Sequence, residues 1–194
     1  MSLKAKNNKA KNNKVKNTKA LVKANKPAAT RASKVKDVLL SQDSKKIKPL
    51  KIAVVTARFN SEVTEKLHEA AIEFLEQLGV EIFSVSVPGA VEIPITIQAL
   101  FEAQKVDGAV ALGAVIRGDT THYEEVCRSV ERGCTTLMLQ YKKPIGFGVL
   151  TTENEEQAFD RAGGVHGNKG HDAAQVVVEM VGLLSEIRNT PLVR

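Results

Sequence analysis

The hydrophobic positions of this chain change their spacing repeatedly after residue 50. Short apolar runs and alternating segments are typical of strands, and apolar residues that recur every three to four positions are typical of helices. Pro94 falls in the first turn of a predicted helix, where proline is tolerated. The patterns predict strands at 52–55, 80–87, 109–112 and 145–150, and helices at 61–78, 92–104, 123–139, 153–162 and 171–188.

The order of these elements predicts the fold class. Strands alternate with helices, which is typical of an α/β fold with a parallel sheet and right-handed connections. We expect a three-layer α/β/α sandwich with a four-stranded parallel sheet, of flavodoxin-like type. Loops that follow parallel strands meet at the carboxyl edge of the sheet, where ligands bind. The loops at 58–60, 88–92, 114–122 and 151–154 are therefore expected to lie together.

Composition divides the chain into two unlike parts. Residues 1–50 hold 15 Lys and Arg against 2 Asp and Glu, a net charge of +13. Residues 51–194 hold 13 against 20, a net charge of −7, so the overall value of +6 describes neither part. The basic part opens with a degenerate five-residue repeat and has too few apolar residues to offset its ordering entropy. We expect a disordered low-complexity tail at 1–48 and one domain at 49–194.

The tail is open to two interpretations. It is either a polybasic arm that contacts nucleic acid or another anionic surface, or a solvated segment with no specific partner. Charge supports only non-specific binding, and residues 1–50 contain no aromatic side chain on which a base could stack. The segment also lacks the apolar core of a secretory signal.

Cysteine spacing and hydropathy favour a cytoplasmic protein. Cys127 and Cys134 lie seven residues apart on one predicted helix. Their Cα atoms are therefore about 10 Å apart, too far for a disulfide, and both are expected to face the core. Unpaired cysteines suit a reducing compartment. No apolar run is long enough to span a membrane.

Residues 113–122, Gly-Ala-Val-Ile-Arg-Gly-Asp-Thr-Thr-His, carry the strongest chemical signal. They follow a predicted strand and lead into a helix. Thr121 and Glu124 have the spacing of a capping box, as do Thr152 and Glu155 before the next helix. Unpaired N–H groups and the helix dipole favour an anion beside His122. An imidazole next to an anion site points to acid–base chemistry on a phosphorylated small molecule.

Several other kinds of site are not indicated. Residues 163–170 are rich in glycine, but they lack the spacing of a P-loop and join two helices. No dinucleotide-binding motif follows the first strand. The four histidines do not have the spacing of zinc ligands.

For four single residues, the sequence pattern alone does not decide between a functional and a structural role. A histidine at a helix start, such as His122, is more often a surface residue than a catalytic one. Phe59 either stacks on a planar ligand or packs beneath its loop. Glu92 and Arg161 either serve a ligand or simply complement a helix dipole.

Taken together, several segments resemble the 6,7-dimethyl-8-ribityllumazine synthase family. They occur in the order and spacing of that family and cover residues 51–188 without the tail. The segments are 58–60, 87–94, 113–122, 147–154, 161–163 and 167–170.

The resemblance implies the penultimate step of riboflavin synthesis. In this reaction 5-amino-6-(D-ribitylamino)uracil condenses with 3,4-dihydroxy-2-butanone 4-phosphate, and phosphate and water leave. No cofactor and no metal is implied.

The resemblance also implies roles for individual residues. His122 is implied as the proton-transfer residue, because a neutral imidazole can take and return protons near its intrinsic pKa. Arg161 is implied to grip the phosphate with its planar guanidinium, and Lys169 to add positive charge there. Phe59 is implied to contact the pyrimidine ring, and Phe147 is implied to contact it from across a subunit interface. The ribityl chain is implied to lie against Ala90, Val91 and Glu92. The uracil edge is implied to contact the backbone of Ala114, Val115 and Ile116, and the phosphate is implied to contact Asp119 and Thr120.

Two positions depart from the family pattern. Val91 stands where many members carry an aromatic residue, so ring contact there is weaker. Asp119 puts a carboxylate beside the phosphate-binding turn. We expect its side chain to point away, so that only the backbone N–H faces the ligand.

The resemblance further implies a homo-pentamer with active sites between neighbouring subunits. Twelve pentamers closing into an icosahedral shell is an open alternative, because residues 163–170 lack the insertion associated with free pentamers. Two other functions also stay open beside the synthase. One is a shell whose basic tail gathers nucleic acid or other anionic cargo, and the other is a flavodoxin-like binding module without catalysis.

Overall fold

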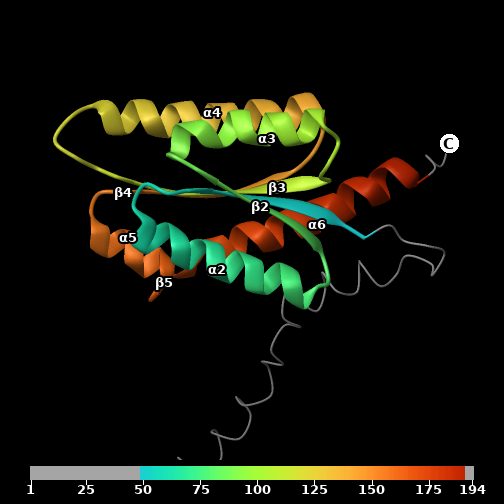
Figure 1. Ribbon diagram of the computed structural model, residues 1–194, viewed down its shortest axis with the longest axis horizontal. Helices are drawn as coiled ribbons and strands as arrows, with labels where there is room; N and C mark the ends of the chain where they lie inside the picture. Colours follow the sequence, from blue (N-terminus) through green and yellow to red (C-terminus); the bar gives the residue numbers. More distant parts are fainter. Residues whose placement is uncertain (1–48, 191–194) are drawn as a thin grey trace, which may run out of the picture.

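A computed structural model describes residues 49–190 and shows a four-stranded parallel sheet between two layers of helices (Figure 1). The strands hydrogen-bond in the order β2–β1–β3–β4, so the chain crosses over between β2 and β3. The expected α/β fold with a four-stranded parallel sheet of flavodoxin-like type is confirmed. The strands are β1 (Lys51–Ala57), β2 (Glu81–Val87), β3 (Gly108–Ile116) and β4 (Ile145–Thr152).

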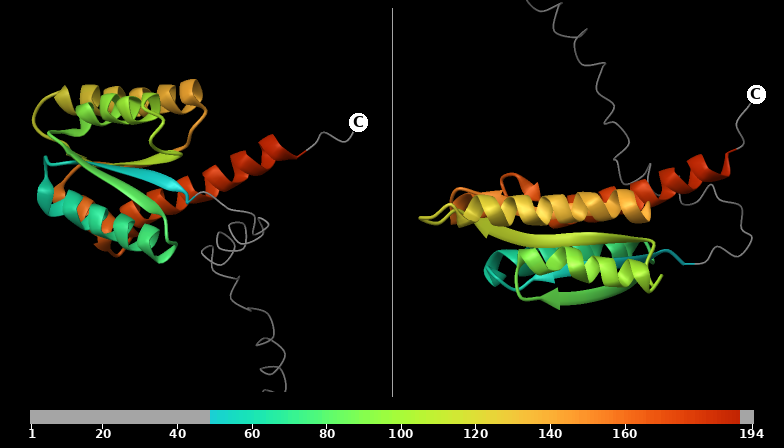
Figure 2. Two further views of the ribbon diagram at one scale, coloured as in Figure 1. Left: turned by 45° about the vertical axis from the view of Figure 1, so that its right-hand side comes forward. Right: turned by 90° about the horizontal axis from the view of Figure 1, so that it is seen from above.

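The helices cover both faces of the sheet. Helices α3 and α4 lie on one face, and α2, α5 and α6 lie on the other, with α2 and α6 side by side (Figures 1 and 2). A 3-10 turn η1 (Ala90–Glu92) precedes α3. The helices are α2 (Ser61–Gln77), α3 (Ile93–Glu102), α4 (His122–Tyr141), α5 (Glu155–Arg161) and α6 (Lys169–Asn189).

Each face of the sheet has its own hydrophobic core. The core under α2 and α6 includes Leu67, Leu112 and Val177, and the core under α3 and α4 includes Ile97 and Val130. Strand β3 is buried from its start through Ala114, as expected for a central parallel strand covered on both sides. Both cysteines are unpaired; Cys134 is buried and Cys127 is half-buried.

The end of β3 differs from its predicted position. The sequence places the loop from Gly113 onward, because a glycine after a short apolar run is typical of a turn. In the structure β3 continues to Ile116, where it still pairs with Thr152 of β4. The loop that precedes α4 is therefore only residues 117–121.

Both predicted capping boxes are wrong. Thr121 is the N-cap residue of α4, but its side chain makes no capping hydrogen bond, and the Glu124 side chain pairs with Arg117. Helix α5 is capped by Asn154, whose Oδ1 accepts a hydrogen bond from the Gln157 N–H at 2.9 Å. The Thr152 hydroxyl donates to the Asn154 carbonyl at 3.0 Å.

The glycine-rich residues 163–170 form a short antiparallel pair and the start of α6. Strands β5 (Ala162–Gly164) and β6 (Gly167–Asn168) make up the pair. At Gly170 a Cβ atom would lie 2.0 Å from the Leu67 carbonyl oxygen, so only glycine allows α6 to approach α2 this closely.

None of the helices in the described part of the chain combines the length and hydropathy needed to cross a bilayer. The tail predicted at 1–48 lies outside the described residues.

Candidate active site

The loops that follow all four strands are joined at the carboxyl edge of the sheet. The backbone N–H of Arg58 donates to Val87 at 2.8 Å, and that of Phe59 donates to Pro88 at 3.2 Å. At the other side of the edge, the Arg117 N–H donates to the Thr152 carbonyl at 2.9 Å. The predicted meeting of these loops is confirmed.

Asn60 ties the first loop to the central strand. Its backbone has φ 59°, a left-handed conformation that asparagine adopts more readily than most residues. The sequence offers either Asn60 or Ser61 as the cap of this helix; Asn60 is the N-cap residue of α2, but its side chain makes no capping bond. Instead Nδ2 donates to the Ala114 carbonyl at 2.8 Å.

The last residues of β3 extend beyond the end of β1, towards this loop. Pairing of β3 with β1 ends at Leu112, whereas pairing with β4 continues to Ile116. One side of the backbone of residues 114–116 therefore has no strand partner among residues 49–190. The Ala114 carbonyl on this side accepts the hydrogen bond from Asn60, and the peptide groups that remain can hydrogen-bond a planar ligand.

Two exposed apolar side chains come from the loops at the same edge. Phe59 is 70% exposed and Val91 is 45% exposed, whereas Ala90 is buried. The Glu92 Oε2 accepts a hydrogen bond from the Gly89 N–H at 2.9 Å, which holds the carboxylate over the turn between β2 and α3. An aromatic face, an apolar side chain and a carboxylate thus border one end of the edge.

Helix α4 begins at this edge with His122. The His122 N–H lies 3.4 Å from the Thr120 hydroxyl oxygen, and Asp119, Thr120 and His122 are all exposed. The first backbone N–H groups of an α-helix have no partner within the helix, so this turn favours an anion.

A charged cluster that the sequence analysis missed brackets this turn. The Arg117 guanidinium pairs with Glu124 through Nη1 and with Glu153 through Nε at 2.6 Å, and it lies 4.2 Å from the centroid of the Tyr123 ring. The hydrogen bond that Arg117 donates to Glu124 raises the pKa of Arg117 and lowers the pKa of Glu124. No local pattern reveals this cluster, because Glu153 is 36 residues away in sequence.

Phe147, Arg161 and Lys169 line a separate groove of about 940 Å³ between β4, α4 and α6. Phe147 is 41% exposed there. Arg161 Nη1 donates to the Gln157 carbonyl at 3.0 Å, and Lys169 Nζ lies 2.7 Å from Asp172 Oδ2. Two cations and one aromatic side chain therefore face the same opening.

Within a single chain Phe147 is separated from the edge group, although the groove extends towards the edge as far as Thr151, which pairs with Val115. Phe147 pairs with Ala111 in the middle of the sheet, five residues before Thr152. At about 3.3 Å per residue, its Cα lies roughly 16 Å from the carboxyl edge. The structure therefore brings the predicted residues together as two groups. The edge group is Phe59, Ala90, Val91, Glu92, Ala114, Val115, Ile116, Asp119, Thr120 and His122, and the groove group is Phe147, Arg161 and Lys169.

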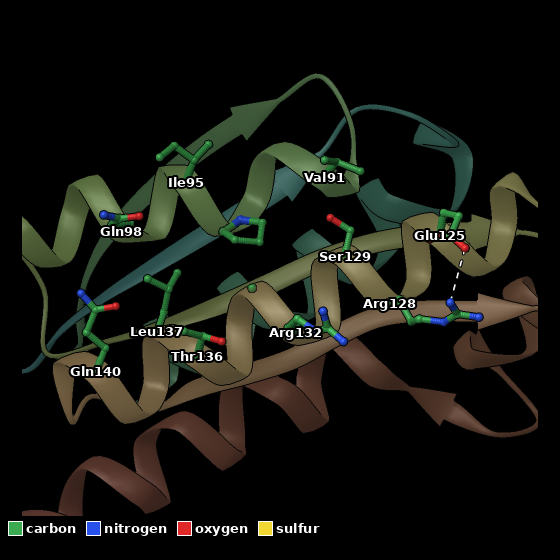
Figure 3. Close-up of a pocket in the computed structure, with 12 residues that line it drawn as sticks. Val91, Ile95, Gln98, Glu125, Arg128, Ser129, Arg132, Thr136, Leu137 and Gln140 are labelled. Carbon is green, nitrogen blue, oxygen red and sulfur yellow. Dashed lines mark hydrogen bonds and ion pairs between the residues drawn. The ribbon is translucent and has the colours of Figure 1, made fainter.

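An open groove of about 710 Å³ also runs between α3 and α4 (Figure 3). It extends from Val91 and Glu125 at one end to Gln98 and Gln140 at the other, and Glu125 and Arg128 form an ion pair along it. The groove meets the edge group only at Val91. Within residues 49–190, no three His, Cys, Asp or Glu side chains are grouped as metal ligands.

The sequence model described as 6,7-dimethyl-8-ribityllumazine synthase matches residues 49–185. This chain belongs to the 6,7-dimethyl-8-ribityllumazine synthase family. The resemblance found in the sequence is confirmed, and residues 1–48 precede the matched span.

Relatives that carry the lumazine synthase name cover the same part of the chain. A 6,7-dimethyl-8-ribityllumazine synthase of Bdellovibrio bacteriovorus is 66% identical over 139 residues, which is 71% of this chain and 77% of that protein. One from Coxiella burnetii is 50% identical over 143 residues, 72% of this chain and 95% of that protein. One from Cytophaga hutchinsonii is 45% identical over 131 residues, 66% of this chain and 82% of that protein.

Proposed function

We propose that this chain is a transferase that condenses 5-amino-6-(D-ribitylamino)uracil with 3,4-dihydroxy-2-butanone 4-phosphate to give 6,7-dimethyl-8-ribityllumazine. The match to the lumazine synthase family over residues 49–185 carries this proposal. The grouping of a flat apolar surface, peptide groups and a helix start at one sheet edge supports it.

The pyrimidine binds at the edge group. Phe59, 70% exposed, provides a face on which the ring stacks. The peptide groups of residues 114–116 that lack a strand partner hydrogen-bond the uracil edge. Glu92 accepts hydrogen bonds from the ribityl hydroxyls, while Ala90 and Val91 border the chain.

The phosphorylated ketone binds where α4 begins. Backbone N–H groups at Asp119 and Thr120 contact the phosphate, and the helix dipole favours its negative charge. The guanidinium of Arg161 offers two parallel hydrogen bonds to the phosphate oxygens, and Lys169 adds a second positive charge.

His122 moves the protons of the reaction. The pyrimidine amine attacks the ketone carbonyl and forms an imine with loss of water. Phosphate is then eliminated, and the resulting enol tautomerises to a second carbonyl. The ribitylamino nitrogen attacks this carbonyl, and loss of a second water completes the lumazine ring. Each step transfers a proton to or from a reacting atom, and a neutral imidazole is suited to this near pH 7. The position of His122 in the first turn of α4, beside the phosphate-binding turn, supports this role.

The active site is completed by a neighbouring copy of the chain. The distance of Phe147 from the edge supports this, since one copy alone does not bring this aromatic ring to the edge group. We propose a homo-pentamer in which the edge group of one subunit faces the groove group of the next. A shell of twelve pentamers is a further arrangement of the same contacts.

Product formation tests the enzymatic proposal. The full-length protein is mixed with both substrates, and the lumazine is followed by its absorbance and identified by mass. We expect product only when both substrates and protein are present, and a loss of at least about tenfold in rate for His122→Gln. A folded, assembled protein that forms no lumazine contradicts the proposal.

A second proposal concerns residues 1–48, which carry all 15 of the Lys and Arg side chains in the basic part of the chain. We infer that they bind nucleic acid or a similar polyanion without sequence preference. Binding of a random RNA is expected to weaken steeply between 50 and 200 mM salt and to disappear when residues 1–45 are deleted, with catalysis intact. Binding that does not respond to salt contradicts this inference.

The unpaired Cys127 and Cys134 support a cytoplasmic location.

A further inference from the structure

Arg117 has no role in the reaction as described so far, yet it joins three elements at the candidate site. It is the first residue after β3, and its backbone N–H donates to Thr152 at the end of β4. Its side chain reaches Glu124 in the first turn of α4 and Glu153 after β4. Residues 117 and 124 thus close the loop that carries the phosphate-binding turn and His122.

Apart from the Thr120 hydroxyl, which accepts a long hydrogen bond of 3.4 Å from the His122 N–H, the start of α4 lacks the usual side-chain cap. The N-cap residue Thr121 makes no capping hydrogen bond with its side chain. The Glu124 carboxylate, which would complete a capping box, instead gives one oxygen to Arg117. The other oxygen, Oε2, is buried and has no hydrogen-bond partner among the described residues.

Arg117 holds the two residues that follow His122. Tyr123 lies under the guanidinium at 4.2 Å, and Glu124 is paired with it. Glu153 at 2.6 Å fixes the same guanidinium to the end of β4. A planar guanidinium can stack on the ring while its in-plane N–H groups donate two charge-assisted hydrogen bonds in fixed directions, whereas a lysine ammonium has no planar face and no fixed donor directions.

We propose that Arg117 is a positioning residue for His122. By fixing Tyr123 and Glu124 to the ends of β3 and β4, it sets the direction in which the first turn of α4 presents the imidazole. This inference rests on the proton-transfer role of His122 proposed above. A displacement of about 1 Å at a reacting group can cost as much as a hundredfold in rate, so a loosened helix start is expected to slow the chemical step.

The test combines substitutions at the two positions. Arg117→Gln and Arg117→Lys are made in the wild-type chain and in His122→Ala, and kcat and both KM values are measured on the assembled enzyme. Arg117→Gln is expected to lower kcat about tenfold or more, with the pyrimidine KM changed less than about twofold, and Arg117→Lys is expected to lie between Gln and wild type. In the His122→Ala background, Arg117→Gln is expected to change kcat by less than about twofold.

A matched control removes the positive charge from another ion pair that joins two secondary-structure elements. Lys51→Gln breaks the 2.8 Å pair between Lys51 on β1 and Glu81 on β2, at the opposite end of the sheet, and is expected to leave kcat unchanged. Equal loss from Arg117→Gln in both backgrounds overturns the positioning role, as does wild-type kcat for Arg117→Gln. Wild-type kcat for His122→Ala instead overturns the proposed role of His122, and the positioning role with it.

Discussion

His68 is a partly buried histidine that couples α2 to the sheet. Its Nδ1 lies 2.9 Å from the Thr56 hydroxyl oxygen on β1. Burial lowers the pKa of His68, and the neighbouring Glu69 opposes this shift only in part. The folded protein therefore binds a proton at this ring less readily than the unfolded chain does.

This shift predicts a loss of stability in mild acid. The unfolded chain takes up a proton near pH 6.5, while the folded ring stays neutral to lower pH, so the free energy of unfolding falls as pH drops below about 6.5. The contribution is expected to be less than about 1 kcal/mol, because the ring is partly solvated. Urea unfolding at pH 7.5 and 5.5 measures it. The loss on acidification should be smaller in His68→Gln and unchanged in His166→Gln, a substitution at an exposed histidine.

Single residues also show why the site could be predicted only in part. Phe59 and His122 stand at strand and helix ends, and the order of elements alone puts such ends at one sheet edge. The partners of Arg117 and Asn60 come from distant segments, and local patterns suggest other partners for both Asn60 and Glu124. Side-chain choices of this kind depend on tertiary distances that no local pattern contains.

At the scale of elements, the start of α6 is fitted closely against α2. The Asn168 Oδ1 accepts a hydrogen bond from the Gly170 N–H at 2.9 Å, and its Nδ2 donates to the Lys66 carbonyl at 3.0 Å. The Cα of Gly170 faces the Leu67 backbone with no room for a methyl group. This contact holds α6, and with it Lys169, in place beside the groove.

Gly170→Ala is expected to destabilise the fold by about 1–3 kcal/mol, because the added methyl group forces α6 away from α2. Thermal unfolding measures the change. Gly118→Ala serves as the control, since a Cβ there meets nothing within 4 Å. Equal midpoints for the two variants would show that α6 shifts at no cost.

Element types were predictable because both periods are strong in this chain. Strands β1 and β3 are apolar runs buried on both faces, the edge strand β2 alternates apolar and polar residues, and α2 repeats Val63, Leu67 and Phe74 at helical spacing. The length of β3 was not predictable, since Gly113 to Ile116 continue as a strand only through pairing with β4.

At the scale of the whole molecule, the two groups of site residues define how copies must meet. If the edge group of one subunit works with the groove group of another, two inactive variants that each carry a defect in a different group should regain activity when their chains are assembled together. Chains carrying His122→Ala and chains carrying Arg161→Ala are unfolded together, refolded at equal amounts, and assayed. Each variant alone is expected to be nearly inactive, and the mixture to recover up to about a quarter of the wild-type rate, the fraction of interfaces that pair two intact groups.

The control mixture combines two defects of the edge group, His122→Ala and Phe59→Ala. Every site in it receives one damaged edge, so no recovery is expected. A His122→Ala and Arg161→Ala mixture no more active than its components would argue that both groups act within one copy.

The extension of β3 past the end of β1 has a consequence for inhibition. In the proposed site, the uracil edge is recognised by peptide groups of residues 114–116, which every amino acid except proline supplies in the same way. A point mutation at these positions changes the side chain and leaves those hydrogen-bonding groups in place. An inhibitor that copies the uracil edge would therefore meet a surface on which resistance mutations have little to act upon.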